Sequence, residues 1–360
     1  MDRRSFLKNT ALGGSAAAAT ALAAPAYAQG NRTLTLVTTW GRGLAGVHDS
    51  AQRVADTITA MTDGQLTIDL KAAGELVGAF EVFDAVTAGQ ADMYHGADYY
   101  FVGQHPGYAF FTAVPFGMTA QELVNWYYHD GGMELHDELG QIFGLKSFLA
   151  GNTGAQAGGW FAKEITGPED FQGLKFRMPG LGGQALGKMG ASVQNLPGSE
   201  VYQALASGAI DGTEWIGPWA DEKAGFQEIT KIYYTAGFHE PGAGLSLATN
   251  REVFDSLTPA QQKIIEIASA ECHQWNLAQF LSNNGAALQR LQSGGVTVRE
   301  FPESVWDAMG VAANEVLQEN MGDELFKRIY DSAMASMRSS SGWLTRSEGV
   351  YREQRDRVLG

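Results

Sequence analysis

Two separate segments of the chain repeat one helix–glycine–strand pattern, and this repeat constrains the fold more than any single motif. Residues 81–92, EVFDAVTAGQAD, and residues 200–211, EVYQALASGAID, are identical at five of twelve positions and end on the same Gly-x-x-Asp. Each segment reads as a helix ended by a glycine and followed by a strand. The repeat predicts two lobes of one architecture. The alternative is chance similarity between two amphipathic helices.

The loops that follow the two repeated strands are the first place to look for a site. Open α/β sheets bind ligands in the crevice beyond the carboxyl ends of their strands. Two equivalent lobes would therefore point these loops at one cleft. By this alignment Glu214 corresponds to His95, and we expect both side chains to face the cleft.

Strand and helix patterns alternate along the chain. Residues 32–40, 66–70 and 91–96 read as strands, and amphipathic helices are predicted over 47–61 and 80–89 between them. The same alternation resumes after Gly151. Residues 258–295 begin with a Thr-Pro helix start and stay helical in pattern for many turns. This order predicts an α/β fold with parallel-rich sheets covered by helices.

The N-terminal 28 residues read as an export signal. Arg3 and Arg4 precede a weakly apolar Ala/Gly stretch, which ends at a small-x-small cleavage site, residues 26–28. Twin arginines indicate the Tat route, with cleavage after about Ala28. A membrane anchor is the alternative, but the stretch is short and rich in alanine and glycine. We therefore expect a periplasmic protein.

Net charge and cysteine content exclude several classes of function. Residues 1–28 carry three basic side chains and one acidic one, so their removal changes the formal net charge from −15 to −17. Such a charge disfavours nucleic acids and anionic membrane surfaces as partners. The single cysteine, Cys272, excludes an internal disulfide and a cysteine-rich metal site, and its helical surroundings indicate a packed side chain.

Enzyme motifs are scarce. Gly41, Gly43 and Gly46 form a G-x-G-x-x-G between a predicted strand and a predicted helix, which suits a dinucleotide-binding loop. The acidic residue that should close the next strand is poorly matched, because Asp69 lies inside that strand. No metalloprotease, serine hydrolase or P-loop signature is present. His129 and His136 are expected to be surface or packing residues.

Four polar residues beside loops are candidates for binding charge. Arg177 stands near a strand end before a turn, where its fork could pair with a carboxylate, although a structural ion pair is an equal alternative. Glu214 lies among aromatic residues, where a charge needs a cationic partner. Glu214, Glu240 and Gln156 all offer oxygen donors, which suit a hard cation such as Ca²⁺ or Na⁺.

Several stretches of this sequence resemble the substrate-binding subunits of TRAP transporters, the periplasmic receptors that feed sodium-driven uptake systems. These stretches are DYYFVGQHPGYAFFTAVPFG, GNTGAQAGGWF, LKFRMPGLGGQALGKMGA and GAIDGTEWIGPWADEKAGF. The match is to the branch that binds 2-oxo acids such as pyruvate, or the hydroxy acid lactate, through a bound cation. The resemblance runs from about Leu34 to the C-terminus. The arginine strand is typical of the whole family, and the GAQxGGW and DGxEW segments are typical of the branch.

The resemblance implies a role for each candidate residue. One cation, Na⁺ or Ca²⁺, would be ligated by Glu214, Gln156, Glu240 and the backbone carbonyl of Trp215. The substrate would add one carboxylate oxygen and its keto or hydroxy oxygen, and Arg177 would hold the other carboxylate oxygen. The remaining wall would be Asn152 and Tyr100, polar, with Trp215 and Phe238 as an apolar lid. Phe238 stands where the branch more often has tryptophan, which puts the pocket size in doubt.

The resemblance also implies a domain plan and partners. We expect a two-lobed periplasmic binding protein with a cleft between its lobes and long C-terminal helices. Lobe I would be 29–152 with about 243–280 returning to it, and lobe II would be 153–242 with about 281–330 packed on it. The expected partners are a small 2-oxo or 2-hydroxy monocarboxylate and the TRAP membrane permease.

Three functions remain to be compared at this point. The leading one is a receptor that binds without catalysis. The second is an exported nicotinamide-dependent oxidoreductase built on the loop of Gly41, Gly43 and Gly46. The third is a cation-dependent hydrolase.

The last thirty residues, 331–360, read as a charged helical extension with a thin apolar stripe. Leu344, Tyr351 and Val358 recur every seven residues, with Trp343 and Val350 beside them. So narrow a stripe suits a seam against one other surface rather than a buried helix. Receptors of the resembled branch include dimers that exchange a C-terminal helix, so we expect a homodimer. Packing on its own subunit, or fraying, is the alternative.

Overall fold

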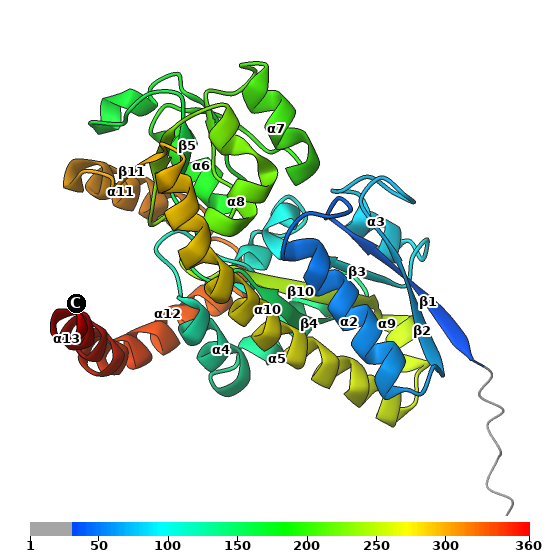
Figure 1. Ribbon diagram of the computed structural model, residues 1–360. Helices are drawn as coiled ribbons and strands as arrows, with labels where there is room; N and C mark the ends of the chain where they lie inside the picture. The colour runs from blue at the N-terminus through cyan, green and yellow to red at the C-terminus, as the bar shows by residue number, and fades with distance from the viewer. Residues whose placement is uncertain (1–30) are drawn as a thin grey trace, which may run out of the picture.

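A computed structural model describes residues 31–360 and shows two α/β lobes, each built on its own sheet (Figure 1). This confirms the predicted two-lobed fold. Both sheets are mixed, with two parallel and two antiparallel pairings in the first and three parallel and two antiparallel in the second, counted over the described residues. The predicted export signal, residues 1–28, lies outside the described residues.

The first sheet has the strand order β2-β1-β3-β10-β4. Its strands are β2 (Leu66–Lys71), β1 (Arg32–Thr38), β3 (Met93–Gly96), β10 (Gly244–Asn250) and β4 (Leu145–Asn152). β10 runs antiparallel to both neighbours, so the chain returns to the first sheet after building the second. The helical segments of this part of the chain are α2 (Val47–Met61), α3 (Val82–Thr87), η1 (Asp98–Phe101), η2 (Pro106–Phe111), α4 (Ala120–His129), α5 (Gly132–Ile142) and α9 (Arg251–Asp255).

The second sheet has the strand order β11-β9-β5-β8-β6-β7. Its strands are β11 (Thr297–Arg299), β9 (Ile232–Tyr234), β5 (Gly159–Phe161), β8 (Gly212–Thr213), β6 (Lys175–Arg177) and β7 (Ser192–Gln194). The helical segments around it are η3 (Pro168–Phe171), α6 (Gly180–Lys188), α7 (Gly198–Ala206), α8 (Pro218–Ala224), η4 (Phe226–Glu228) and α11 (Glu303–Glu319). The predicted lobe boundaries at residues 152 and 242 stay a prediction.

The repeated segment occupies the same structural position in both lobes. The backbone N–H of Asp92 donates to the carbonyl of Thr35 in β1, and the Asp92 carboxylate accepts from the Thr35 N–H at 2.7 Å. Asp211 makes the same two bonds to Lys175 in β6, with its carboxylate 2.9 Å from the Lys175 N–H. In each lobe the final aspartate therefore ties the end of a helix to the neighbouring parallel strand.

One long helix, α10 (Pro259–Ser293), joins the two lobes. Its cap is Thr258, whose hydroxyl accepts from the Gln261 N–H as the Thr-Pro start predicts. The first half of α10 packs on α2 and β4, and the second half packs on α8. Asn276 binds the carbonyl of Gly46 at 2.9 Å in the first lobe, and Asn284 accepts from the Trp219 N–H at 3.1 Å in the second. Figure 1 shows α10 crossing from one lobe to the other.

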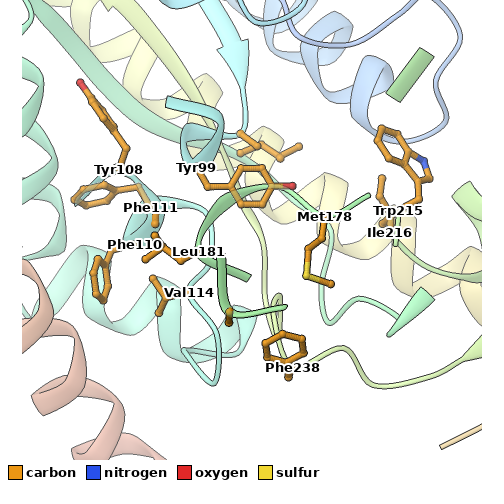
Figure 2. Packing of buried hydrophobic residues seen from close by; sticks show 14 of the residues in the cluster. Tyr99, Tyr108, Phe110, Phe111, Val114, Met178, Leu181, Trp215, Ile216 and Phe238 are labelled. Carbon is orange, nitrogen blue, oxygen red and sulfur yellow. The ribbon is translucent and has the colours of Figure 1, made fainter. Parts of the chain in front are cut away.

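The larger hydrophobic core continues from one lobe into the other. Tyr99 and Tyr108, from the first lobe, belong to the same buried cluster as Met178 and Trp215 from the second. Figure 2 shows these side chains together, with Met178 pointing toward Phe238. Burial across both lobes stabilises the closed arrangement at about 25 cal/mol per Å² of apolar surface removed from water.

The C-terminal segment is one helical run that leaves the body of the molecule (Figure 1). α12 (Glu324–Leu344) continues through a π-turn (Thr345–Gly349) into α13 (Val350–Leu359). Four of the five residues of the predicted seam are exposed, with Trp343 at 73%, Tyr351 at 65% and Val358 at 66%, and Leu344 is half-buried. Between residues 31 and 360, no helix combines the length and apolar character that a membrane crossing requires.

The position of Gly46, directly before α2, requires glycine for two reasons. Gly43, which shares only one of them, is the matched control. Both Gly43 and Gly46 have positive φ, 81° and 77°, so alanine is strained at either position. A Cβ on Gly46 would also lie 2.8 Å from two ring carbons of Phe280 on α10, whereas a Cβ on Gly43 would meet nothing within 4 Å.

We therefore expect Gly46→Ala to lower the free energy of unfolding by about 1–3 kcal/mol more than Gly43→Ala. Urea unfolding of both variants measures the difference. Equal losses would mean that the contact between α10 and the loop does not constrain this glycine.

Candidate ligand and cation site

Arg177 is the only arginine of the described residues among the largest fully buried side chains, and its place follows from the sheet. It ends β6, which pairs in parallel with β8, so the residue after β8 is brought beside it. That residue is Glu214, whose Oε1 forms an ion pair with the Arg177 Nη1. The Nε of Arg177 donates to the carbonyl of Leu196 at 3.1 Å, and its Nη2 donates to the hydroxyl of Tyr100 at 3.4 Å.

The electrostatics of this pair keep Arg177 charged. Burial alone would lower the pKa of Arg177, but the neighbouring Glu214 carboxylate raises that pKa above its usual range. The guanidinium carbon also lies 5.3 Å from the ring centre of Trp215, within reach of a cation–π contact. Glu214, which lies among aromatic residues, thus has Arg177 as its cationic partner.

Glu240 and Gln156 are brought together by two backbone hydrogen bonds. The Gln156 N–H donates to the Glu240 carbonyl and the Gly237 N–H donates to the Gln156 carbonyl, both at 2.9 Å. Burial, and then the charge of Glu214, raise the pKa of Glu240 well above its ordinary value. A positive charge near Glu240 would reverse that shift.

Several buried oxygens around Glu240 have no hydrogen-bond partner within residues 31–360. They are the Oε1 of Gln156, the Oε2 of Glu214 and both carboxylate oxygens of Glu240. A buried acceptor without a partner is destabilising by about 1–3 kcal/mol. Four such oxygens in one place fit a hard cation, which prefers carboxylate and amide oxygen ligands.

A small cavity adjoins these oxygens, with a volume of about 10 Å³, which is room for about one water molecule. Residues from both lobes line it, including Trp40, Tyr99, Tyr100, Gln156, Trp215 and Glu240. Four of the predicted site residues, Tyr100, Gln156, Trp215 and Glu240, are thus part of one cavity wall. Arg177 and Glu214 adjoin it through Tyr100 and Trp215.

Asn152 and Phe238 do not line this cavity. The Asn152 Oδ1 accepts from the Gly154 N–H at 2.7 Å, while its Nδ2 is buried without a partner among the described residues. Phe238 packs against Phe116, with ring centres 5.9 Å apart. Their roles as polar wall and apolar lid stay predictions.

The prediction that His95 faces the cavity is wrong. His95 is held inside the first lobe, where its Nδ1 accepts from the Trp40 indole N–H at 2.9 Å and its Nε2 lies 3.2 Å from the Ala150 carbonyl. Burial lowers the pKa of His95 to about 4, so the ring is neutral at pH 7. The indole of Trp40 lines the cavity instead.

The other histidine expectations hold. His129 is exposed, and His136 is buried with its Nε2 3.0 Å from the carboxylate of Asp98. Sequence reasoning missed His239, which lies between Glu214 and Glu240; one ligand atom from each of the three falls within 4.8 Å of the others. The available signal was its position directly before Glu240 in FHEPG.

The glycine-rich loop at 41–46 does not resemble a functioning phosphate cradle. The Gly46 N–H already donates to the carboxylate of Asp49 at 3.0 Å, and Phe280 covers the same glycine. Asp69 is exposed on β2 and paired with Lys71 at 3.0 Å. An acidic side chain at this helix start opposes an incoming phosphate.

A larger hollow elsewhere is a weaker candidate for the binding site. It has a volume of about 370 Å³ on the first lobe and is lined by residues that include Asp137, Lys146, Lys263 and Glu266. Both of its lysines are already paired, Lys146 with Asp137 at 2.9 Å and Lys263 with Glu266 at 2.7 Å. The smaller cavity between the lobes is therefore the better candidate.

The chain matches a known family over most of its length. Residues 41–323 match the DctP family model, described as bacterial extracellular solute-binding protein, family 7. The chain belongs to this family. It is a periplasmic solute-binding receptor of the TRAP type, and its family argues against the oxidoreductase reading.

Relatives within the family are similar over nearly their whole length. A monocarboxylate 2-oxoacid-binding periplasmic protein of Nostoc is 39% identical over 317 residues, which is 88% of this chain and 87% of the relative. The TRAP solute-binding protein of Pseudoalteromonas atlantica, solved with sodium and pyruvate, is 39% identical and has a TM-score of 0.87 over 90% of this chain and 99% of its own.

A second solved relative adds a second cation and a second ligand. The TRAP solute-binding protein of Bordetella bronchiseptica is a mixed-occupancy dimer with copurified calcium and picolinate at its active site. It is 31% identical to this receptor, with a TM-score of 0.89 over 91% of this chain and 98% of its own.

The buried ion pair of this receptor predicts a large stability effect. Arg177→Met should leave the Glu214 carboxylate buried without its cation, at a cost of about 3–5 kcal/mol in the free energy of unfolding. The double variant Arg177→Met, Glu214→Gln removes the orphaned charge as well and should recover most of that loss. Urea unfolding without ligand measures both. Equal destabilisation of the single and the double variant would show that the pair is not the source.

Proposed function

We propose that this receptor binds a small 2-oxo monocarboxylate, pyruvate or a close analogue, together with one Na⁺ or Ca²⁺. It then delivers the ligand to a TRAP membrane permease, by binding and release without catalysis. The observation that carries the proposal is the buried Arg177 beside four buried oxygens that lack hydrogen-bond partners within residues 31–360. A hard cation would satisfy these oxygens, and a ligand carboxylate could then replace Glu214 as the partner of Arg177.

Each predicted residue has a place in this proposal. Arg177 holds one carboxylate oxygen of the ligand through its planar fork. The cation is held by Glu214, Glu240, the Gln156 amide oxygen and the backbone carbonyl of Trp215. The ligand supplies its other carboxylate oxygen and its keto oxygen. The rest of the wall is Tyr100 and Asn152, with Trp215 and Phe238 closing over the ligand.

Chelation explains how so small a ligand can be retained. A ligand of a few heavy atoms gains little from apolar contact. Arg177 and Glu214 are both fully buried, so the contact of Arg177 with the ligand and that of Glu214 with the cation lie in a water-poor site, where they are stronger than in water. The same burial requires an exchange: the ligand carboxylate takes Arg177 from Glu214, and the cation compensates the released glutamate.

The relatives support this reading without fixing the ligand. Proteins similar to this chain hold pyruvate with sodium or with calcium, or picolinate with calcium. Lactate and longer 2-oxo acids are the competing ligands. We further propose export through the Tat route with cleavage after about Ala28, as the twin arginines indicate.

Tryptophan fluorescence tests the ligand and the cation together. The chain has eight tryptophans, and the indoles of Trp40 and Trp215 line the cavity. We expect pyruvate to bind at micromolar concentration in calcium or sodium, and to bind at least about tenfold more weakly in chelator and sodium-free buffer. Lactate and longer 2-oxo acids are titrated alongside. The proposal would be contradicted by a pyruvate affinity that is the same with and without the cation, or by no binding of any 2-oxo or 2-hydroxy acid.

The effect of Glu214→Gln on pyruvate affinity should change sign between calcium and cation-free buffer. In excess calcium the variant loses a cation ligand and should bind pyruvate at least about tenfold more weakly than wild type. Without any cation, Arg177 is released from its ion pair, so the variant should bind pyruvate about tenfold more tightly than wild type.

Glu240→Gln is the matched control for this reversal. It removes a neighbouring buried charge but leaves the pair of Arg177 and Glu214 in place. In calcium, Glu240→Gln should bind pyruvate more weakly than wild type. Without any cation, its gain in pyruvate affinity should be smaller than that of Glu214→Gln. An equal gain in both variants would assign the effect to total charge rather than to the ion pair.

We also propose that the C-terminal extension, 331–360, makes a homodimer. Its apolar seam is exposed in this subunit, and a similar receptor is a dimer. Cutting the chain near Ser340 should convert the dimer to a monomer while leaving pyruvate affinity unchanged, because the removed residues do not line the site. Sedimentation of full-length and truncated mature protein is the measurement. A full-length monomer at micromolar concentration would contradict it.

A further inference from the structure

His239 is a buried histidine that faces the two glutamates of the site. Its side chain is 2% exposed, and its Nε2 lies 3.4 Å from the Oε2 of Glu214 and 3.9 Å from the Oε1 of Glu240. Neither ring nitrogen has a hydrogen-bond partner within the described residues. An unpaired buried imidazole is destabilising, so its retention here calls for a role.

Two glycines hold the imidazole in this position. A Cβ on Gly237 would lie 2.7 Å from the Nδ1 of His239, and a Cβ on Gly182 would lie 2.6 Å from its Cβ. The ring therefore occupies space that only glycine leaves free on both sides. Gly237 also donates to the carbonyl of Gln156, so the segment that fixes the ring fixes a proposed cation ligand too.

The imidazole of His239 and the free oxygens of the two glutamates can pair with each other, because the ring can donate and the carboxylates accept. One oxygen of Glu214 is held by Arg177, and the other, Oε2, faces the histidine. Two buried carboxylates this close repel each other, which favours an N–H donor between them. The two distances exceed those of formed hydrogen bonds. A shift of the Glu214 carboxylate by a few tenths of an ångström toward the ring would complete the bond to Glu214.

We propose that His239 is a positioning residue: its imidazole donates from Nε2 and holds Glu214 and Glu240 at the separation that the cation requires. This inference rests on the proposed function. Sodium and calcium prefer oxygen ligands, so the imidazole acts on the carboxylates rather than on the cation. A divalent ion is attracted to two carboxylates more strongly than sodium is. By holding both carboxylates in place, His239 therefore raises the affinity for calcium more than that for sodium.

Two variants of similar size separate the donor from the bulk of the ring. In His239→Gln the amide N–H₂ can replace the imidazole Nε2–H, whereas His239→Leu fills space without donating. Calcium is titrated calorimetrically at saturating pyruvate, and the ratio of calcium to sodium affinity is compared among the proteins. His129→Leu, an exposed histidine on α4, is the control.

We expect His239→Leu to bind calcium about tenfold or more weakly and to lose calcium preference, and His239→Gln to stay within about threefold of wild type. A folded His239→Gln that loses as much as His239→Leu would overturn the donor role. If His239→Leu and wild type bind calcium equally, the inference fails while the proposed function stands. If wild type holds no cation at all, the proposed function itself fails.

A spectroscopic measurement on the wild-type protein does not depend on any variant folding. Mn²⁺ is bound in place of calcium, and electron spin echo envelope modulation detects nitrogen nuclei coordinated to it. The positioning role predicts no directly coordinated imidazole nitrogen. A strong coupling to a directly coordinated imidazole nitrogen in the wild-type protein would make His239 a metal ligand and overturn the proposal.

Discussion

The buried ion pair of Arg177 and Glu214 is the interaction on which the rest of the site depends. Both side chains are removed from water, so each is tolerable only while its charge is compensated. The parallel pairing of β6 with β8 brings them together, because one residue ends β6 and the other directly follows β8. A ligand carboxylate that pairs with Arg177 in place of Glu214 leaves the charge of Glu214 uncompensated. A cation that binds Glu214 without a ligand leaves the charge of Arg177 uncompensated. Anion and cation are therefore favoured together over either one alone.

The proposed exchange would take place between the two lobes, because residues of both line the cavity. Trp40 and Tyr100 reach the cavity from the first lobe, and Gln156, Trp215 and Glu240 reach it from the segments that join or build the second. Opening the lobes would expose these groups to water and weaken every charged contact between them. The single helix α10, anchored in both lobes, connects them along one side. Affinity and conformation are thus linked through the same buried charges.

The sequence predicted what local patterns encode. The repeat at 81–92 and 200–211 was confirmed because its aspartates make the same two backbone bonds in each lobe. Arg177 and the glutamates were predicted as site residues because charged residues at strand ends and among aromatics are conspicuous, and the structure brings them close together. His95 was placed wrongly because a repeat gives chain position but not side-chain direction within a sheet. His239 was missed because its meaning depends on Glu214 and on two glycines, Gly182 and Gly237, which only tertiary structure brings beside it.

The central claim is that one ligand is held jointly by Arg177 and a cation, and calorimetric linkage tests it most directly. Pyruvate is titrated at increasing fixed calcium, and calcium at increasing fixed pyruvate. The account predicts that each raises the affinity of the other by the same large factor, about tenfold or more. A factor of one, with pyruvate bound equally well at every calcium concentration including none and in the absence of sodium, would contradict it.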